Sequence, residues 1–401
     1  MEVKRGYKQT EVGIVPEEWE IKSLYMLADK IMIGIASAAT HAYQNIKRGF
    51  LDDSDVLFIA EENEETYRNK RLKSGDLLTA RTGYPGTTCV VPEHYEGAQS
   101  FTTLITRPRR DSVHPAYLCS FINSEAGQRY FDQNQIGGGQ KNVNAGSLKF
   151  LPIPLPPTLA EQEAIATALS DADAWIESLE QLIAKKRQIK QGAMQELLTS
   201  KRRLPGFEVK PGCKQTEVGL IPKDWKIALI EEIAHITTGS RNTQDRVDDG
   251  KYPFFVRSQT VERINSYSFD GEAVLTAGDG VGTGKVFHYI NGRFDTHQRV
   301  YRMSDFRERV NGYFFFLYFS RHFYARIMQM TAKSSVDSVR REMIARMQIP
   351  LPPTQAEQEA IATALSDMDT EIAKLETKLC KARQIKQGMM QELLTGRIRL
   401  I

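Results

Sequence analysis

A long segment of this 401-residue chain occurs twice, and the rest of the sequence is arranged around the two copies. The copies span residues 153–199 and 349–395 at a fixed offset of 196, and 35 of their 47 positions are identical. So long a near-copy is an internal repeat, which constrains the architecture before any local pattern does. We therefore expect two equivalent structural units.

Each copy begins with a proline-rich run, at 152–157 and 350–353, where fixed φ angles and missing N–H groups exclude helix and favour extended backbone. The pattern T-x-x-E follows, from Thr158 to Glu161 and again from Thr354 to Glu357. This pattern is typical of a capping box, in which the Thr and Glu side chains satisfy each other's backbone donors. A helix should begin at this point in each copy.

The apolar positions that follow step alternately by four and three residues, which is typical of a coiled-coil seam. A helix over 159–199 would be about 60 Å long, although Gly192 and Gly388 could kink or end the two helices. We expect the two helices to pair antiparallel within one chain, and a homodimeric coiled coil is the alternative. The Lys/Arg run at 185–190 is expected to be a solvated face. The predicted seam residues are Ile165, Leu169, Ile176, Leu179 and Ile183, and Ile361, Leu365, Ile372, Leu375 and Leu379.

Composition is that of an ordinary soluble protein, with 41% hydrophobic and 26% charged residues. No apolar run of membrane-spanning length occurs, and the N-terminus lacks a signal sequence, so we expect a cytoplasmic protein without a membrane segment. The four cysteines are scattered, which favours reduced thiols over disulfides or a zinc site. The net charge of +3 permits a local nucleic-acid-binding patch but does not require one.

A second repeat precedes each variable block. Residues 8–19 (KQTEVGIVPEEW) and 214–225 (KQTEVGLIPKDW) share eight of twelve positions at an offset of 206. The order is thus lead-in, variable block and long helix, then the same three again. The domain boundaries that we predict are 1–152 for the first lead-in and block, 153–204 for the first helix, 205–348 for the linker, second lead-in and second block, and 349–401 for the second helix.

The blocks themselves, at about 20–150 and 226–346, show short β-like runs between glycine-rich turns, followed by a helical stretch. Each is expected to be a small α+β domain with a curved sheet. The expected strands are 56–59, 77–79, 88–91 and 103–106 in the first block, and 273–276, 285–287 and 300–301 in the second. The expected helices are 115–131 and 312–328.

Known catalytic patterns are missing from the sequence. The turn at 278–285 fails the P-loop pattern because Asp279 stands at the first glycine position and Val286 replaces the magnesium-binding Ser/Thr. We interpret it as a loop between two strands. There is no H-E-x-x-H, no G-x-S-x-G and no N-P-P-Y or D-P-P-Y of adenine methyltransferases. We predict no catalytic and no metal-binding residues.

Polar loops in the blocks could read DNA, since base edges and phosphates are contacted by Arg, Lys, Asn, Gln, Ser and Thr. Two such loops, at 137–144 and 333–341, precede the two repeats at equivalent positions, and further candidates lie at 81–88 and 278–285 and, near the start of each block, at 40–44 and 239–244. Ordinary solvated loops are the alternative, and Tyr84 could equally stack on a base or fill the core. The candidate DNA-binding residues are Arg81, Thr82, Tyr84, Thr87, Gln140, Lys141, Asn142, Asn144, Arg241, Asn242, Lys285, Lys333, Ser334, Ser335, Arg340 and Arg341.

The motifs K-Q-T-E-x-G-x-x-P-x-x-W, P-L-P-P-T-x-A-E-Q and Q-E-L-L-T, each in two copies around variable blocks, resemble the specificity (S) subunit of type I restriction-modification systems. The resemblance covers essentially the whole chain. It implies two target-recognition domains held apart by an antiparallel helix pair, and double-stranded DNA as ligand. It also implies assembly with two modification (methyltransferase) subunits and with restriction (motor/nuclease) subunits, which would hold S-adenosylmethionine, ATP and Mg; no cofactor is expected in this chain.

The resemblance therefore implies a non-catalytic subunit that reads an asymmetric bipartite target, with one half-site per domain and a spacer set by the helices. It would direct adenine methylation and restriction by its partners. Three alternatives stay open: a coiled-coil adaptor unrelated to DNA, an enzyme built from unfamiliar motifs, and an orphan specificity subunit that only guides methylation.

Overall fold

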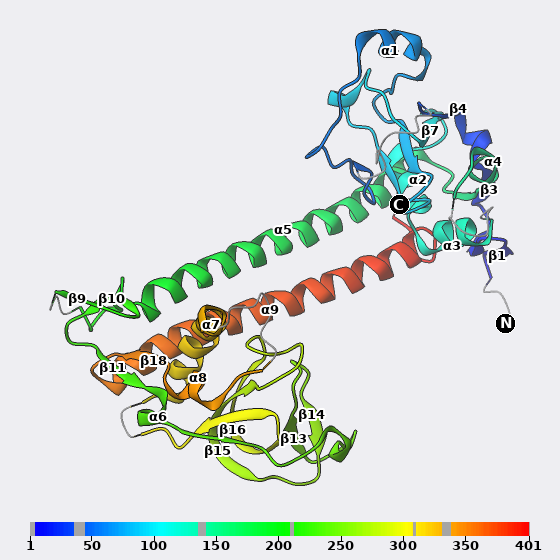
Figure 1. The fold of residues 1–401 in the computed structure, drawn as a ribbon. Coiled ribbons are helices and arrows are strands. Elements are labelled where there is room, and N and C mark those ends of the chain that lie inside the picture. Colours follow the sequence, from blue (N-terminus) through cyan, green and yellow to red (C-terminus); the bar gives the residue numbers. More distant parts are fainter. Residues whose placement is uncertain are drawn as a thin grey trace. The chain divides into compact units, whose positions relative to one another are not determined.

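The computed structural model describes residues 5–35, 45–134, 142–208, 212–307, 310–330 and 338–400. The chain divides into two compact units, one of residues 1–181 and 376–401 and the other of residues 182–375. Each unit contains one variable block and a part of each long helix (Figure 1). The α+β class is confirmed, and each unit combines segments from both sequence repeats.

In the first unit, the lead-in forms the hairpin β1–β2 and continues into β3, which pairs antiparallel with the proline-rich strand β8. Trp19, just before β3, is fully buried in the core. The block therefore begins and ends on two paired strands, and the extended run predicted before the helix is confirmed. The bounds are β1 (Tyr7–Thr10), β2 (Gly13–Pro16), β3 (Glu20–Ser23) and β8 (Pro152–Leu155).

The first block is built on a four-stranded antiparallel sheet in the order β4-β7-β5-β6. Its strands are β4 (Ala28–Ile33), β5 (Leu77–Ala80), β6 (Thr88–Val90) and β7 (Thr103–Pro108). Its helices are α1 (Glu61–Thr66), α2 (Pro115–Ile122), α3 (Glu125–Gln133) and α4 (Ala145–Lys149), with short 3-10 turns η1 (Leu24–Leu27), η3 (Arg68–Lys70) and η4 (Glu93–Tyr95).

Two predictions for this block were wrong. The single helix expected over 115–131 is two helices, because Asn123 leaves the helix to bond both backbone groups of Thr88 in β6, and Ser124 then caps α3 by accepting from the Gly127 N–H. The strand expected at 56–59 is not formed: this segment has no strand partner, and Phe58 is 94% exposed. High β-propensity forms a strand only where a neighbouring strand and a core are available to pack against.

The second unit repeats the same plan. The hairpin β9–β10 leads to the buried Trp225, and β11 pairs antiparallel with β18 before the second long helix. The bounds are β9 (Cys213–Thr216), β10 (Gly219–Pro222), β11 (Lys226–Leu229) and β18 (Gln348–Leu351).

The second block holds a six-stranded sheet in the order β12-β17-β15-β16-β13-β14, in which β13 runs parallel to β16 and the other neighbours are antiparallel. Its first four strands match the order β4-β7-β5-β6 of the first block. Two blocks with dissimilar sequences therefore share one sheet plan. The strands are β12 (His235–Thr238), β13 (Tyr252–Phe255), β14 (Glu262–Ile264), β15 (Phe269–Ala277), β16 (Phe287–Thr296) and β17 (Val300–Ser304).

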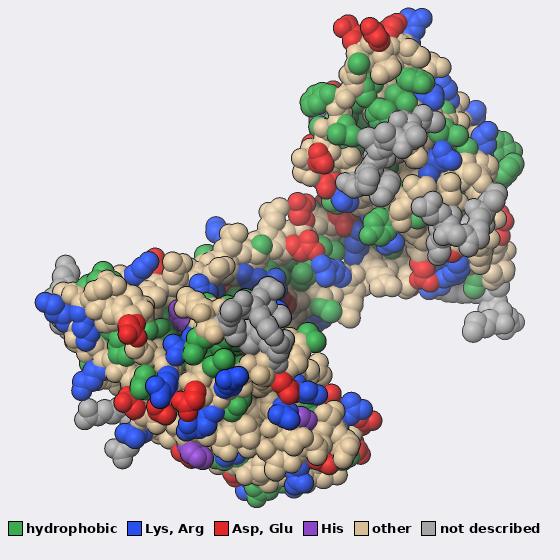
Figure 2. All heavy atoms as spheres, viewed as in Figure 1, with side chains coloured by type: hydrophobic (Ala, Val, Ile, Leu, Met, Phe, Trp, Pro, Cys, Tyr) green, Lys and Arg blue, Asp and Glu red, His purple; other side chains and the backbone are tan. Residues whose placement is uncertain are grey.

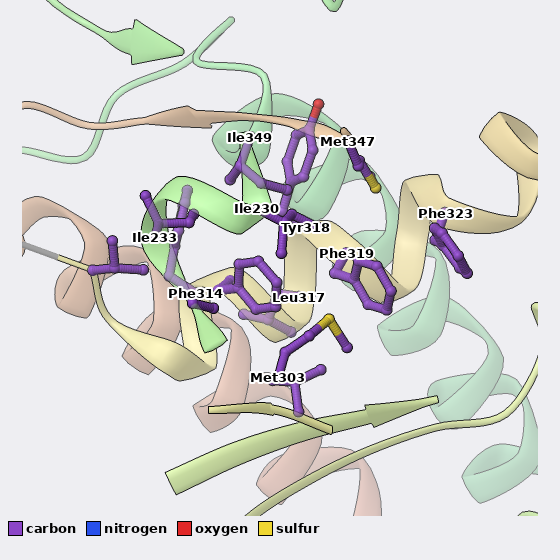
Figure 3. Close-up of a cluster of buried hydrophobic side chains, with 14 of the residues drawn as sticks. Ile230, Ile233, Met303, Phe314, Leu317, Tyr318, Phe319, Phe323, Met347 and Ile349 are labelled. Carbon is purple, nitrogen blue, oxygen red and sulfur yellow. The ribbon is translucent and has the colours of Figure 1, made fainter. Parts of the chain in front are cut away.

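The core of the second unit lies between this sheet and the aromatic helix α7. In Figure 3, Leu317 and Phe319 of α7 lie near Met303 of β17, and Phe314 lies near Ile233 of α6. The helix predicted over 312–328 is confirmed as α7, and the loop predicted at 278–285 does connect two strands, β15 and β16. The helical elements are α6 (Ile230–Ile233), η5 (Thr243–Asp245), α7 (Gly312–Met330) and α8 (Arg341–Ala345).

The two long helices are α5 (Leu159–Leu198) and α9 (Gln355–Leu393), and both run through their internal glycines without a break. Thr158 caps α5 by accepting from the Glu161 N–H at 3.2 Å, and Thr354 does the same for Glu357. The predicted reciprocal half of the capping box was wrong, because both glutamate carboxylates instead accept from arginines. Arg399 binds Glu161, and Arg203 binds Glu357.

Most of the predicted seam residues are buried. Those that are buried are Ile165, Leu169, Leu179, Ile183, Ile361, Leu365 and Ile372, while Ile176, Leu375 and Leu379 are half-buried. In the first unit, Ile165 and Leu169 of α5 share a core with Leu393 of α9. In the second unit, Ile361 and Leu365 of α9 share a core with Leu197 of α5.

Ion pairs join the same two helices within each unit. Lys386 binds Asp173 in the first unit, and Lys190 binds Asp369 in the second, so the two pairs are related by the repeat offset of 196. The interpretation of 185–190 as a solvated face was therefore wrong at Lys190, whose side chain is only 19% exposed because it follows the seam and reaches the other helix.

Candidate nucleic-acid interface

The structure places a hairpin loop at the same position of the sheet in both blocks, residues 81–87 between β5 and β6 and residues 278–286 between β15 and β16. The Val143 N–H donates to the Arg81 carbonyl at 3.0 Å, and the Val339 N–H donates to the Gly278 carbonyl at 2.7 Å. These valines are 196 residues apart. In both blocks, therefore, the described end of the second predicted loop, residues 142–144 or 338–341, lies beside the hairpin loop.

In the first block, the hairpin loop presents Tyr84, whose side chain is 77% exposed and so does not fill the core. Arg81 and Thr82 are half-buried. Thr87 is only 7% exposed and its backbone continues the sheet by bonding Ala80, so it was a wrong candidate. Its burial follows from its position one residue before β6.

The neighbouring segment of the first block is partly structural. The Asn144 side chain accepts from the Ser147 N–H at 2.8 Å and caps α4, so its oxygen is committed to the fold. Asn142 is half-buried beside it. The predicted loop 40–44 and the candidates Gln140, Lys141, Lys333, Ser334 and Ser335 lie outside the described residues.

In the second block, Arg241 and Asn242 follow β12 and contact the short connection between β16 and β17. The Arg241 guanidinium bonds the fully buried Asp295 at 3.2 Å, and Asn242 accepts from Gln298 at 2.6 Å. Arg241 thus supports the fold as well as presenting a half-exposed charge. The hydrogen bond from the Gln298 amide holds the Asn242 side chain at the surface.

The hairpin loop of the second block carries an ion-pair group that the sequence prediction missed. Asp279 lies 3.0 Å from Arg257 and 3.7 Å from Arg299. Burial lowers the pKa of the adjacent His297, and the Arg257 charge lowers it further, so the neutral form of this histidine is favoured. The polar residues in the turn after β16 could have marked Arg299 as a candidate DNA-binding residue. No sequence pattern marks Arg257.

The remaining predicted cations of this block lie on the same loops. Lys285, at the end of the hairpin loop, is exposed and sits 5.5 Å from the centre of the Tyr324 ring. Arg340 and Arg341 are exposed at the start of α8, directly after Val339. The hairpin loop and its neighbours therefore gather more positive than negative charge, as contact with phosphates requires.

Charge is distributed differently elsewhere on the surface. Figure 2 shows acidic side chains gathered at α1, where Glu61, Glu62 and Glu64 lie in the first turn, and Lys and Arg interspersed with acids on the visible face of the second unit. Acidic α1 is unsuited to a phosphate backbone. The net charge of +3 therefore conceals local differences.

A cavity of about 870 Å³ lies in the first unit between the helices α2 and α3 of the block and the long helices. Two ion pairs lie in its wall, Lys386 with Asp173 and Arg129 with Glu125. Burial raises the pKa of Cys119 in its wall, so this residue stays a thiol and is no nucleophile. The described residues contain no cluster of His, Cys, Asp or Glu suited to a metal ion, and within that same part of the chain no helix is long and apolar enough to cross a membrane.

Comparison with known proteins gives one consistent answer. Residues 16–191 and 222–382 match the family model of the type I restriction modification DNA specificity domain. The chain is 25% identical to each of two Methanocaldococcus jannaschii proteins, the putative type I restriction enzyme MjaX specificity subunit and the type I restriction enzyme MjaVIII specificity subunit. Each match covers 99% of this chain and 97% of the relative. The EcoDI specificity subunit of Escherichia coli is 29% identical over 44% of the chain and 38% of its own length.

Among solved structures, the S subunit of a type I restriction-modification system from M. genitalium has the same fold, with a TM-score of 0.63 at 12% identity over 98% of both chains. The family model covers well over half of the sequence, in both repeats. The chain therefore belongs to the type I restriction-modification DNA specificity family, and it is a DNA sequence-recognition subunit.

Proposed function

We propose that this subunit reads an asymmetric bipartite DNA target, with one half-site for each variable block. The observation that carries the proposal is that two blocks on the same sheet plan present different residues on the equivalent hairpin loop, an exposed Tyr84 in one and an Asp279 ion-pair group in the other. Equivalent loops with different side chains suit two readers with different targets.

The helices α5 and α9 pair as an antiparallel coiled coil, and this pair sets the length of the unread spacer between the half-sites. Support comes from the heptad stepping of the seam and from the related ion pairs Lys386–Asp173 and Lys190–Asp369. Twofold-related readers bind half-sites roughly one DNA turn apart, ~34–36 Å.

The subunit itself is non-catalytic and directs adenine methylation and restriction by partner subunits. Two modification subunits would supply S-adenosylmethionine, and restriction subunits would supply ATP and Mg. This part of the proposal rests on the family and on the missing catalytic motifs of the sequence. With a net charge of only +3, the lone chain should bind DNA weakly because its partners contribute most phosphate contacts.

The test is to co-express the chain with a modification subunit of its family in a methylation-free host and to map the methylated adenines. We expect one bipartite motif, which changes in only one half when residues 20–150 are exchanged for another block. Exchange of residues 226–346 is the matched control and should change the other half. A stable complex without methylation, or a motif that changes in both halves, contradicts the proposal.

A further inference from the structure

Asp279 and its two arginine partners, Arg257 and Arg299, place a carboxylate between two cations, which contact with phosphates alone does not require. We infer that Arg257, Asp279 and Arg299 form a base-reading group, and that the half-site of the second block contains a G·C pair read by one of these arginines. This inference rests on the proposed function and adds the identity of one base pair to it.

The ion pairs among the three side chains leave guanidinium nitrogens available to contact a base. One carboxylate oxygen of Asp279 lies 3.0 Å from Nη1 of Arg257. The other lies 3.7 Å from Nε of Arg299. The outer nitrogens of Arg299 are thus left for a ligand, and its side chain is 65% exposed. The Arg257 side chain is 45% exposed and Asp279 is 27% exposed, so all three reach the surface.

The backbone beneath the group is held rigidly. The Gly278 N–H donates to the Arg299 carbonyl at 2.7 Å, and the Arg299 N–H donates to Nδ1 of His297 at 3.0 Å. Gly282 of the hairpin loop packs so closely against the backbone of Arg257 that an added Cβ would lie 2.4 Å from the Arg257 carbonyl oxygen. Residues that read bases need this kind of support, because a loose side chain loses the geometry that separates one base from another.

The chemistry of the group favours a G·C pair. An arginine fork matches the O6 and N7 acceptors of guanine, and a carboxylate can accept from N4 of cytosine. A carboxylate is repelled by phosphates, so Asp279 would weaken a site that served only the backbone. Arg241, by contrast, bonds the fully buried Asp295 and belongs to the scaffold.

The first block supplies an internal comparison. Its hairpin loop, 81–87, carries Tyr84 and no carboxylate. The ion-pair group is therefore a property of the second block alone, and any base preference that it confers should appear in one half of the target only.

The experiment maps methylation by the complex containing the wild-type chain or the variants Arg257→Lys, Arg299→Lys and Asp279→Asn. Lysine keeps the positive charge for phosphate contacts but loses the two-pronged fork, so it separates base reading from backbone binding. Arg293→Lys is the matched control, since Arg293 pairs with Asp270 at 2.8 Å in the same sheet and both side chains are about half exposed. Amide hydrogen exchange of α7 verifies that each variant is folded.

We expect the wild-type motif to contain a G·C pair in the half assigned to the second block. At least one arginine variant should relax specificity at that position by roughly 5- to 150-fold, the range for one lost bidentate pair, while Arg293→Lys leaves the motif unchanged. A half-site without any G·C pair, an unchanged motif in both arginine variants, or a uniform loss of methylation at all positions would each overturn the inference. Absence of a bipartite motif in the wild-type complex overturns the proposed function, and this inference with it.

Discussion

Two arginines, Arg203 and Arg399, occupy equivalent places at the ends of the two conserved segments. Each makes a two-pronged ion pair with the buried glutamate in the first turn of the other long helix, Glu357 or Glu161. These bonds raise the pKa of both guanidinium groups. Each arginine also bonds the acid that precedes a buried lead-in tryptophan, so one side chain joins three conserved segments.

Removal of Arg203 should destabilise the fold because it leaves the buried carboxylate of Glu357 without this partner. Arg203→Ala should lower the free energy of unfolding by roughly 3–5 kcal/mol, since the Arg203 and Glu357 side chains are 9% and 2% exposed. Arg383→Ala is the matched control, because the Arg383 and Glu180 side chains are both about half exposed and their ion pair should contribute less than ~1 kcal/mol. Urea unfolding measures both, and equal losses would refute the special role of Arg203.

At the scale of the element, helix interiors and hairpin loops use glycine differently. Gly192 of α5 has nothing within 4 Å of an added Cβ, whereas Gly284 has a φ of +67° and Ile327 at 2.3 Å. Gly192→Ala should therefore stabilise the protein by about 1 kcal/mol. Gly284→Ala should destabilise it by more than that amount, through backbone strain and overlap. Thermal unfolding tests the opposite signs, and a loss of stability in Gly192→Ala would contradict the first.

Burial of histidines predicts how the second unit responds to acid. Burial is the main cause that lowers the pKa of His288, His297 and His322 from the ordinary 6.5. Below about pH 6.5 the unfolded chain therefore binds more protons than the folded one, and stability falls until the lowered folded pKa values are passed. Above that window these three groups stop contributing to the pH dependence.

Amide hydrogen exchange of α7, corrected for its intrinsic pH dependence, should show this loss of stability between pH 7.5 and pH 5.5. His322→Gln should reduce the slope because it removes one of the three groups. The control is His94→Gln, in the first block, where the side chain is exposed. A slope that is unaffected by His322→Gln would show that burial of this group does not govern the response.

The sequence predicted the long helices, the extended run before each of them and several strands of both sheets, because these depend on periodicity and on proline and glycine chemistry. It did not predict the pairing of β3 with β8 or of β11 with β18, nor the strands β4, β12, β13 and β14. It failed where tertiary contacts decide. The segment 56–59 has strand-like residues but no strand to pair with, and Asn123 breaks a helix to bond Thr88. The Asp279 group was missed because Arg257 and Arg299 lie 42 residues apart in the chain (299 minus 257) and meet only in the folded sheet.

At the scale of the whole molecule, the chain consists of two similar halves, and the long helix of each half ends in the unit that contains the block of the other half. Residues 199–204 link the halves in the second unit, and residues 395–400 occupy the equivalent place in the first. Each unit is consequently completed by a segment from the other half of the sequence. A change in the helices between these anchors should alter the separation of the blocks without altering either block.

Helix length is therefore a direct test of the proposed spacer. Insertion of seven helix-forming residues after Gln181 in α5 and after Leu375 in α9 preserves the heptad seam and adds about 10 Å to each helix. At ~3.4 Å per base pair, the unread spacer should lengthen by up to about three base pairs, while both half-sites stay the same. Methylation mapping measures the spacer. Insertion into α5 alone should instead abolish methylation, because the two helices can no longer pair in register, and an unchanged spacer after the double insertion would show that the helices do not set it.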